Sequence, residues 1–219
     1  MRLLRLMLAG LAMLCFAGAS IAAPVQGQDY TLLTPPQPTE PGKKVEVIEF
    51  FAYYCPHCNA LDRSLSEWVR SQGDKIVFKR VHVSANGEPM PQQRLYFALE
   101  SLGKVEEFHS KIFYAIHFQR VHMNTDADVI DFMVKQGMDR DKFTALYNSF
   151  TVQSKVNRAI QMMSAYKIDS WPTLIVDGKY VTSPAIAGSR MPSYEESTAQ
   201  NLMLKVLDGL VDQAAKTHH

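Results

Sequence analysis

Cysteine is scarce in this chain, with 3 among 219 residues, and the formal net charge is only +1. So small a charge imbalance gives no reason to expect a nucleic acid or an acidic substrate as a partner. The one long apolar run covers residues 6–18 and is too short to cross a bilayer comfortably. With 47% hydrophobic and 21% charged residues and no evident repeat, the sequence is typical of a globular protein with one or two cores.

The apolar run has the features of an export signal. Arg2 and Arg5 precede it, and small residues lead from it to Ser20-Ile21-Ala22. We therefore expect residues 1–22 to be a signal peptide that is cleaved after Ala22. A retained N-terminal anchor is the alternative.

Removal of the leader leaves only two cysteines. Cys15 lies inside the apolar run, and the residues before it do not form a convincing lipoprotein site. The mature chain would then carry Cys55 and Cys58 alone. In oxidising compartments cysteines usually form a structural framework, but a pair this close closes too small a loop to stabilise much chain. We therefore expect the pair to be present for its reactivity.

The sequence around the pair predicts a strand followed by a helix. Residues 45–51 are nearly all apolar, which is typical of a strand buried on both faces of a sheet. Pro56 suits the first turn of a helix, and apolar residues then recur at helical spacing until Gly73. Cys55 would thus lie at a helix N-terminus, where unpaired N–H groups and the helix dipole stabilise a thiolate. This is the expected setting of a redox-active dithiol.

The rest of the chain predicts an α/β protein. A strand over residues 75–83 would complete a right-handed β-α-β unit, and a short edge strand is expected over residues 29–33. Residues 91–168 show helical periodicity throughout, with Gly103 and Gly137 as stop signals and Thr125 and Asp139 as N-caps.

The last part of the chain returns to strands. Residues 173–176 and 179–182 flank Asp177-Gly178, which indicates a hairpin with a two-residue turn. Ser193 to Glu196 form a capping box that predicts the start of a final helix.

These features together resemble a known family. The segment Glu49-Phe50-Phe51-Ala52-Tyr53-Tyr54-Cys55-Pro56-His57-Cys58, the proline before the hairpin, the helical block and the leader are similar to those of DsbA-type periplasmic thiol:disulfide oxidoreductases of the thioredoxin superfamily. The resemblance covers essentially the whole mature chain. It implies a thioredoxin-like domain formed by residues 23–90 and 169–219, with residues 91–168 as an inserted helical subdomain.

The resemblance also implies an activity. The family donates a disulfide to newly exported, reduced and unfolded proteins and is then reoxidised by DsbB, a quinone-coupled membrane partner. The expectation is therefore a periplasmic, monomeric enzyme that uses the Cys55–Cys58 disulfide and needs no cofactor or metal. Strong oxidising power is a property of that family and is implied only through it.

The chemistry assigns roles around the pair. A substrate thiolate attacks the sulfur of Cys55, expected to be the exposed member, and Cys58 leaves as a thiolate. His57 can donate to or pair with the Cys55 thiolate. Glu49 lies in the buried strand, so it needs a partner such as Lys79 or Arg80. By resemblance Glu49 exchanges protons with Cys58, and a structural ion pair is the alternative.

The segment Trp171-Pro172-Thr173 is the second candidate site. By resemblance Pro172 is a cis proline facing the cysteines, and the main chain of Trp171 could pair with an extended substrate peptide. The family commonly has a smaller residue before this proline, so Trp171 is a departure. Tyr54, Thr173 and Pro184 complete the expected substrate contacts. Asp62, in the first helical turn, is expected to be a surface charge.

Three alternatives use the same residues. The protein could be a disulfide isomerase or reductant, a Cu(I)-binding chaperone, or a peptide-binding protein without catalysis. A zinc site would need further ligands, and there is no second cysteine pair to supply them. His109, His117 and His122 lie apart in the predicted helical block.

Overall fold

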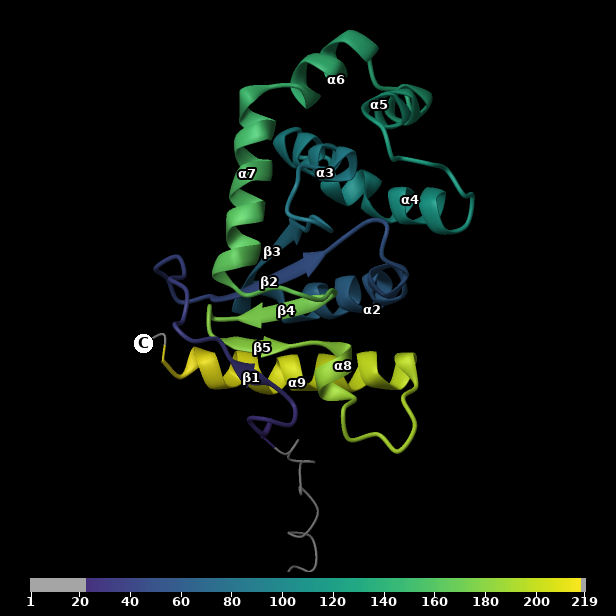
Figure 1. The fold of residues 1–219 in the computed structure, drawn as a ribbon. Coiled ribbons are helices and arrows are strands. Elements are labelled where there is room, and N and C mark those ends of the chain that lie inside the picture. Colours follow the sequence, from purple (N-terminus) through teal and green to yellow (C-terminus); the bar gives the residue numbers. More distant parts are fainter. Residues whose placement is uncertain (1–22, 218–219) are drawn as a thin grey trace, which may run out of the picture.

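The computed structural model describes residues 23–217 (Figure 1). The predicted leader, its cleavage site after Ala22 and Cys15 lie outside these residues. Among the helices of residues 23–217, none is long and apolar enough to cross a membrane.

A mixed five-stranded sheet lies at the centre, in the order β1-β5-β4-β2-β3. Strands β2 (Val45–Phe51) and β3 (Ile76–His82) are parallel and are joined through helix α2 (Pro56–Gln72), which confirms the predicted β-α-β unit. Every residue of β2 is buried, as its apolar sequence predicted. Gly73 caps the C-terminus of α2 with a φ of 54° and is the first residue of a short 3-10 turn, η1 (Gly73–Lys75).

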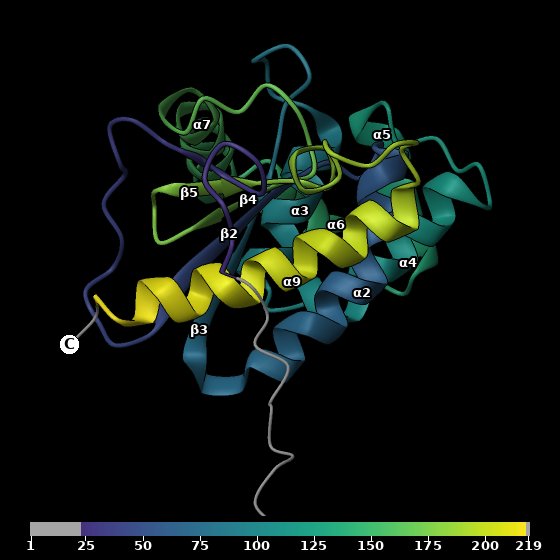
Figure 2. The ribbon, with the colours of Figure 1, turned by 90° about the horizontal axis from the view of Figure 1, so that it is seen from below.

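Helices cover the two faces of the sheet unequally. On one face α2 and α9 (Glu196–Ala215) lie side by side (Figure 2). The apolar side chains that meet there come from alternate sheet positions and from both helices: Val45, Val47, Leu174, Val176, Leu61, Leu65, Trp68, Met203, Leu207 and Leu210. Because alternate strand residues point to opposite faces, Ile48 and Phe50 of β2 face the other side.

The other face carries the helical block predicted for residues 91–168. It contains α3 (Pro91–Ser101), α4 (Val105–His117), α5 (Asp126–Lys135), α6 (Arg140–Tyr147) and α7 (Phe150–Ala165). Thr125 and Asp139 cap α5 and α6, and Gly103 and Gly137 have positive φ values just after α3 and α5, as predicted. Figure 1 shows α7 beside the sheet and α3 to α6 grouped above it.

The hairpin is formed by β4 (Thr173–Val176) and β5 (Tyr180–Thr182). The predicted turn residues Asp177 and Gly178 have φ values of 52° and 64°, which suit a left-handed turn. A Cβ atom on Gly178 would lie 2.1 Å from the carbonyl oxygen of Gln37, so the position also needs glycine for space.

The N-terminal segment is attached to the end of the chain. Strand β1 (Thr31–Leu32) is shorter than predicted and pairs antiparallel with β5. The hydroxyl of Thr182 donates to the carbonyl of Asp29 at 2.8 Å. Pro24 packs so closely on α9 that a Cβ on Gly209 would lie 2.5 Å from its ring. The first described residues therefore rest on the last strand and helix.

The start of α9 differs from the prediction. The chain first forms the short helix α8 (Pro184–Ala187), and α9 begins only at Glu196. Its N-cap is Glu195, whose carboxylate accepts hydrogen bonds from the backbone N–H groups of Ser197 and Thr198 at 3.0 and 2.7 Å. The predicted cap Ser193 is wrong: it lies before the helix, and the carboxylate of Glu195 satisfies the first free N–H groups instead.

Candidate active site

The two cysteines lie where β2 gives way to α2. Cys55 is the N-cap of α2, with extended φ and ψ of −82° and 117°, and Pro56 occupies the first turn. The sulfur of Cys55 accepts a hydrogen bond from the backbone N–H of Cys58 at 3.3 Å. Both cysteines are free thiols in the structure. The reacting sulfur thus takes the place of a capping oxygen.

Both sulfurs are buried, with a small difference between them. Cys55 is 5% exposed and Cys58 is fully covered. The expectation of an exposed Cys55 therefore needs correction: it is the more accessible of the pair, but only slightly. The loop before β4 covers this strand end, and when Cys55 is protonated its thiol donates to the carbonyl of Trp171 at 3.6 Å.

The surroundings shift the pKa values of the two thiols in opposite directions. A hydrogen bond from the Cys58 thiol lowers the pKa of Cys55 to about 6 against the effect of burial, helped by the backbone N–H groups of Cys58 and His57 and by the charge of His57. Burial raises the pKa of Cys58, and the hydrogen bond to Cys55 and the charges of Cys55 and Glu49 add to the rise. At neutral pH the reduced pair is therefore a Cys55 thiolate and a Cys58 thiol.

The imidazole of His57 has a carboxylate as its hydrogen-bond partner. Its Nδ1 lies 2.7 Å from Oε1 of Glu196, the first residue of α9. The hydrogen bond to Glu196 raises the pKa of His57 above its usual value. The direct partner of the imidazole is thus a carboxylate, and its effect on Cys55 is through charge.

The peptide bond between Trp171 and Pro172 is cis, as the resemblance implied. The carbonyl of this bond is the one that faces the Cys55 thiol. The ring of Trp171 is half-buried and stands edge-on to Tyr54, with ring centroids 6.2 Å apart. Thr173 is buried at the start of β4, where its hydroxyl donates to the carbonyl of Ser170 at 2.8 Å. Trp171 is therefore the residue of this segment that meets both solvent and the cysteine loop.

Tyr54 and Pro184 occupy different environments. The hydroxyl of Tyr54 is buried without a hydrogen-bond partner among the described residues, and burial raises its pKa to about 12. Pro184 is also buried, in the first turn of α8, which packs on α9. Pro184 is therefore buried in α8, which does not favour the substrate contact expected of it.

A buried group of charges lies beneath the pair. Nε of Arg80 is 2.9 Å from Oε2 of Glu49, and Nη2 of Arg80 is 3.7 Å from Oδ1 of Asp62. Arg80 is therefore the partner of Glu49, while Lys79 pairs with Glu40 and Glu46. Burial raises the pKa of Glu49 in spite of Arg80, so this carboxylate holds a proton more readily than an exposed one.

Asp62 is buried, which corrects its prediction as a surface charge. Its carboxylate lies 3.2 Å from Nε2 of His109 and accepts a hydrogen bond from Ser110 at 2.8 Å. Burial opposes its charge, but His109 and Ser110 outweigh that effect and lower its pKa. Nδ1 of His109 in turn lies 3.1 Å from the hydroxyl of Tyr53. A signal for Asp62 was present, because it follows Cys58 by four residues and so lies on the same helix face.

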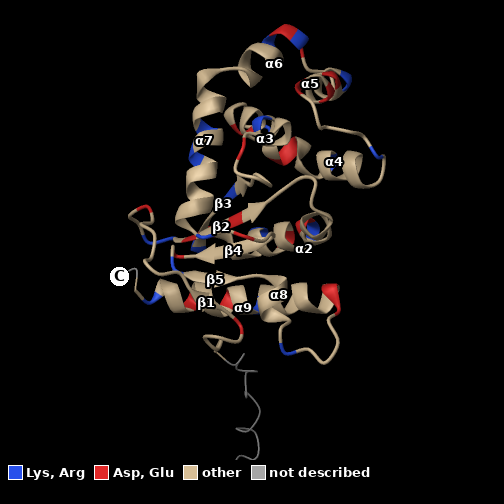
Figure 3. Cartoon of the chain, viewed as in Figure 1, with Lys and Arg blue, Asp and Glu red and all other residues tan. Residues whose placement is uncertain are grey.

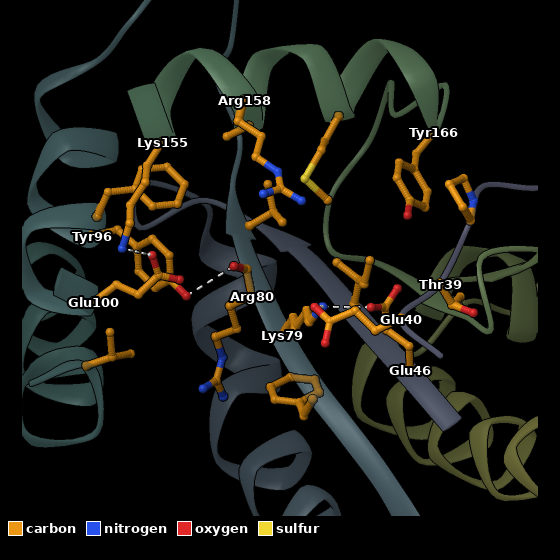
Figure 4. A pocket seen from close by; sticks show the side chains of 18 of the residues that line it. Thr39, Glu40, Glu46, Lys79, Arg80, Tyr96, Glu100, Lys155, Arg158 and Tyr166 are labelled. Atoms are coloured by element: carbon orange, nitrogen blue, oxygen red, sulfur yellow. Dashed lines mark hydrogen bonds and ion pairs between the residues drawn. The ribbon is translucent and has the colours of Figure 1, made fainter. Parts of the chain in front are cut away.

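A cavity beside the sheet is separate from the cysteines. It has a volume of about 740 Å³ and lies between α7, α3 and the strands β2 and β3 (Figure 4). Figure 4 shows Arg158 and Lys155 of α7 above it and the Lys79–Glu40 pair below. None of the predicted site residues lines it. Over residues 23–217 there is also no group of three or more His, Cys, Asp or Glu side chains placed to hold a metal.

Comparison with known sequences gives a consistent set of relatives. The family model of the DSBA-like thioredoxin domain matches residues 78–196. The thiol:disulfide interchange protein DsbA of Burkholderia cepacia is 43% identical over 198 residues, which is 90% of this chain and 89% of that protein.

Solved structures give the same fold. The oxidoreductase DsbA from Xylella fastidiosa matches with a TM-score of 0.76 at 27% identity, over 88% of this chain and 98% of that one. A Proteus mirabilis DsbA variant, solved with a non-covalently bound peptide PWATCDS, matches with a TM-score of 0.67 at 21% identity, over 85% of this chain and 100% of that one. The thioredoxin-like α/β fold is thus confirmed.

Proposed function

The chain belongs to the DsbA family of thiol:disulfide oxidoreductases, and from that premise we propose that it donates the Cys55–Cys58 disulfide to reduced proteins newly exported to the periplasm. The observation that carries the direction of electron flow is the capped sulfur of Cys55, whose pKa is lowered to about 6. A stabilised thiolate favours the reduced form of the enzyme, and an enzyme that prefers to be reduced oxidises its substrates.

The proposed reaction proceeds in two exchanges. A substrate thiolate attacks the sulfur of Cys55, the bond between Cys55 and Cys58 breaks, and Cys58 leaves as a thiolate that takes up a proton. A second substrate thiolate then attacks the substrate-side sulfur of the mixed disulfide, and Cys55 leaves as a thiolate. The substrate has lost two electrons to form its disulfide, and the enzyme has gained them as a thiolate and a thiol.

Glu49 is the proposed proton carrier for Cys58. The burial that raises its pKa prepares it to hold a proton, and its charge acts on Cys58. During reoxidation Cys58 must lose its proton before it attacks a mixed disulfide, and Glu49 is the acid–base group proposed for that step. Its ion pair with Arg80 is compatible with this role.

The substrate is proposed to lie along the Trp171-Pro172 segment. The main chain there faces the Cys55 sulfur, so an extended peptide on this segment would bring its cysteine to that atom. Pro56, Tyr54 and Thr173 shape the cysteine loop and the strand start. The bulk of Trp171 narrows the space next to it.

The rest of the cycle follows the family. We propose that residues 1–22 direct export and are removed after Ala22, that the enzyme acts as a monomer, and that a quinone-linked membrane oxidase of DsbB type restores the disulfide. Residues 23–90 with 169–219 would form the thioredoxin-like domain, and residues 91–168 its helical insert.

A redox titration of the Cys55–Cys58 pair against glutathione tests the proposed function. We expect a potential more oxidising than that of protein disulfide isomerase, about −180 mV. A value near that of thioredoxin, about −270 mV, would instead make the protein a reductant.

A further inference from the structure

The contact between His57 and Glu196 joins two distant parts of the chain next to the reacting sulfur. His57 lies in the first turn of α2 and Glu196 opens α9, 139 residues later. These two helices pack side by side on the same face of the sheet (Figure 2). The carboxylate of Glu196 is therefore carried by an element whose position relative to α2 is fixed by the core.

The position of Glu196 favours a charged carboxylate. It lies in the first turn of α9, where Figure 3 shows acidic residues gathered at the helix start. The positive end of a 20-residue helix stabilises a negative side chain there. The side-chain amide of Gln200 also donates to Oε1 of Glu196 at 3.4 Å. The carboxylate is thus held toward His57 by its own helix.

We propose that Glu196 is a positioning residue for disulfide exchange, which fixes the His57 ring beside Cys55 and keeps that ring protonated. The consequence is that an imidazolium accompanies the Cys55 thiolate to a higher pH than it would without Glu196. Glu196 would stabilise the Cys55 thiolate whatever the protein does. That this makes the protein a stronger oxidant rests on the proposed function.

Two opposing effects of Glu196 have to be separated. The carboxylate keeps His57 charged, which stabilises the thiolate, but its own negative charge repels the thiolate. The charged and titratable groups near the ring are Cys55 on α2 and Glu196 on α9. Glu195 and Tyr194 precede Glu196, and the Glu195 carboxylate is occupied by the N–H groups of α9.

The pH dependence distinguishes the two effects. Below the ordinary histidine pKa of about 6.5 the ring is protonated with or without a carboxylate partner. Above that pH only a partnered ring stays charged. The stabilising effect of Glu196 should therefore appear above about pH 6.5 and fade below it, whereas simple repulsion would act at every pH.

The test uses Glu196→Gln with Glu67→Gln as the matched control. Glu67 is an exposed acid of α2 that pairs with Arg63 and does not contact His57, so its loss changes the net charge equally. The equilibrium with glutathione and the thiolate absorbance of the full mature protein are measured from pH 5.5 to pH 8. At pH 7.5 we expect Glu196→Gln to be about two- to fivefold less oxidising, as suits an exposed ion pair. At pH 5.5 this loss should disappear, and the variant should be as oxidising as the unmodified protein or slightly more so, because only the repulsion is then removed. Glu67→Gln should match the unmodified protein throughout.

Other outcomes would overturn the proposal. A Glu196→Gln protein that is more oxidising at pH 7.5, or that differs by the same factor at every pH, would show that the carboxylate acts only by repulsion. In a His57→Ala background, Glu196→Gln should no longer make the protein less oxidising, and a loss as large as in the unmodified background would also overturn the proposal. The potential of the unmodified protein tests the proposed function separately, since the variant difference is measurable whatever that potential is.

Discussion

Cys55 and Cys58 each lie near a pair of opposite charges, but the two pairs see very different amounts of water. The side chains of His57 and Glu196, beside Cys55, are 62% and 36% exposed. Those of Arg80 and Glu49, beneath Cys58, are 7% and 3% exposed. Solvent screens the first pair, whereas loss of one partner from the second leaves a buried charge without compensation.

This difference follows the task of each sulfur. We propose that Cys55 is the sulfur that meets the substrate, so groups beside it must tolerate water and can adjust its thiolate only slightly. Cys58 stays inside the protein, so its proton has to be handled by groups that are already buried. The comparison predicts large effects from changes beneath Cys58 and small ones from changes beside Cys55, apart from the sulfurs themselves.

The largest effect should come from replacing either cysteine by serine. Cys55→Ser removes the attacked atom, so oxidation of a reduced peptide should be lost completely. Cys58→Ser leaves Cys55 able to attack but unable to complete the exchange. Supplied with an oxidised thiol, it should therefore accumulate a mixed disulfide that is visible by mass spectrometry. Full activity in both variants would contradict the roles assigned to the pair.

Arg80→Leu should have the next largest effect, which is a lower free energy of unfolding. It leaves Glu49 and Asp62 buried without their cation, which costs about 3–5 kcal/mol. Urea unfolding of the oxidised protein measures the loss. The control Arg140→Leu breaks an exposed pair with Asp131 and should cost no more than about 1 kcal/mol. Equal effects of the two variants would remove the contrast between buried and exposed pairs.

The stability of the reduced form should depend on pH through Cys55. Its pKa is lowered from 9.0 to about 6 in the folded protein. A lowered pKa adds stability that is complete above the unfolded value and is lost as the pH falls through the folded one. Between pH 9 and pH 6 the reduced form should thus lose about 3–4 kcal/mol relative to the oxidised form.

Denaturant unfolding of both forms across this pH range provides the measurement. The oxidised form has no titrating thiol and serves as the reference. Above about pH 9 the raised pKa of Cys58 should reverse the trend, because the unfolded chain then ionises a thiol that the folded protein keeps protonated. Parallel curves for the two forms would mean that Cys55 is not a stabilised thiolate.

Glu49→Gln should act on one kinetic step. The amide keeps the shape of the side chain but cannot take the proton of Cys58, so resolution of a mixed disulfide by Cys58 should slow on the order of 10²-fold. Stopped-flow measurement of reoxidation follows this step. Glu46→Gln is the control on the same strand, since Glu46 pairs with Lys79 on the opposite face. A similar slowing in both would indicate a structural role for Glu49.

Most of the fold could be predicted from local sequence patterns. The apolar run of β2, the proline in the first turn of α2, the capping residues Thr125 and Asp139 and the Asp177-Gly178 turn all depend on near neighbours, and each was predictable. The start of α9 was missed because Ser193 and Glu196 have the spacing of a capping box, although the helix is capped by Glu195.

The site was predictable only where contacts are local or implied by the family. The candidates for the partner of Glu49 could be limited to Lys79 and Arg80, because both lie on the strand expected to pair with the strand of Glu49. Glu196 could not be found, since its contact with His57 spans 139 residues and depends on how α9 packs against α2. His109 was equally hidden, because its contact with Asp62 crosses from α4 to α2.

The attachment of the first described residues to the end of the chain constrains the order in which the molecule can assemble. A polypeptide that emerges N-terminus first presents Pro24 and β1 long before Gly209 and β5 exist to receive them. These contacts can form only after nearly complete synthesis or translocation. A truncation at either end would expose the surface between β1 and β5 and between Pro24 and α9. Once these contacts are lost, limited proteolysis should release fragments from both ends of the chain together.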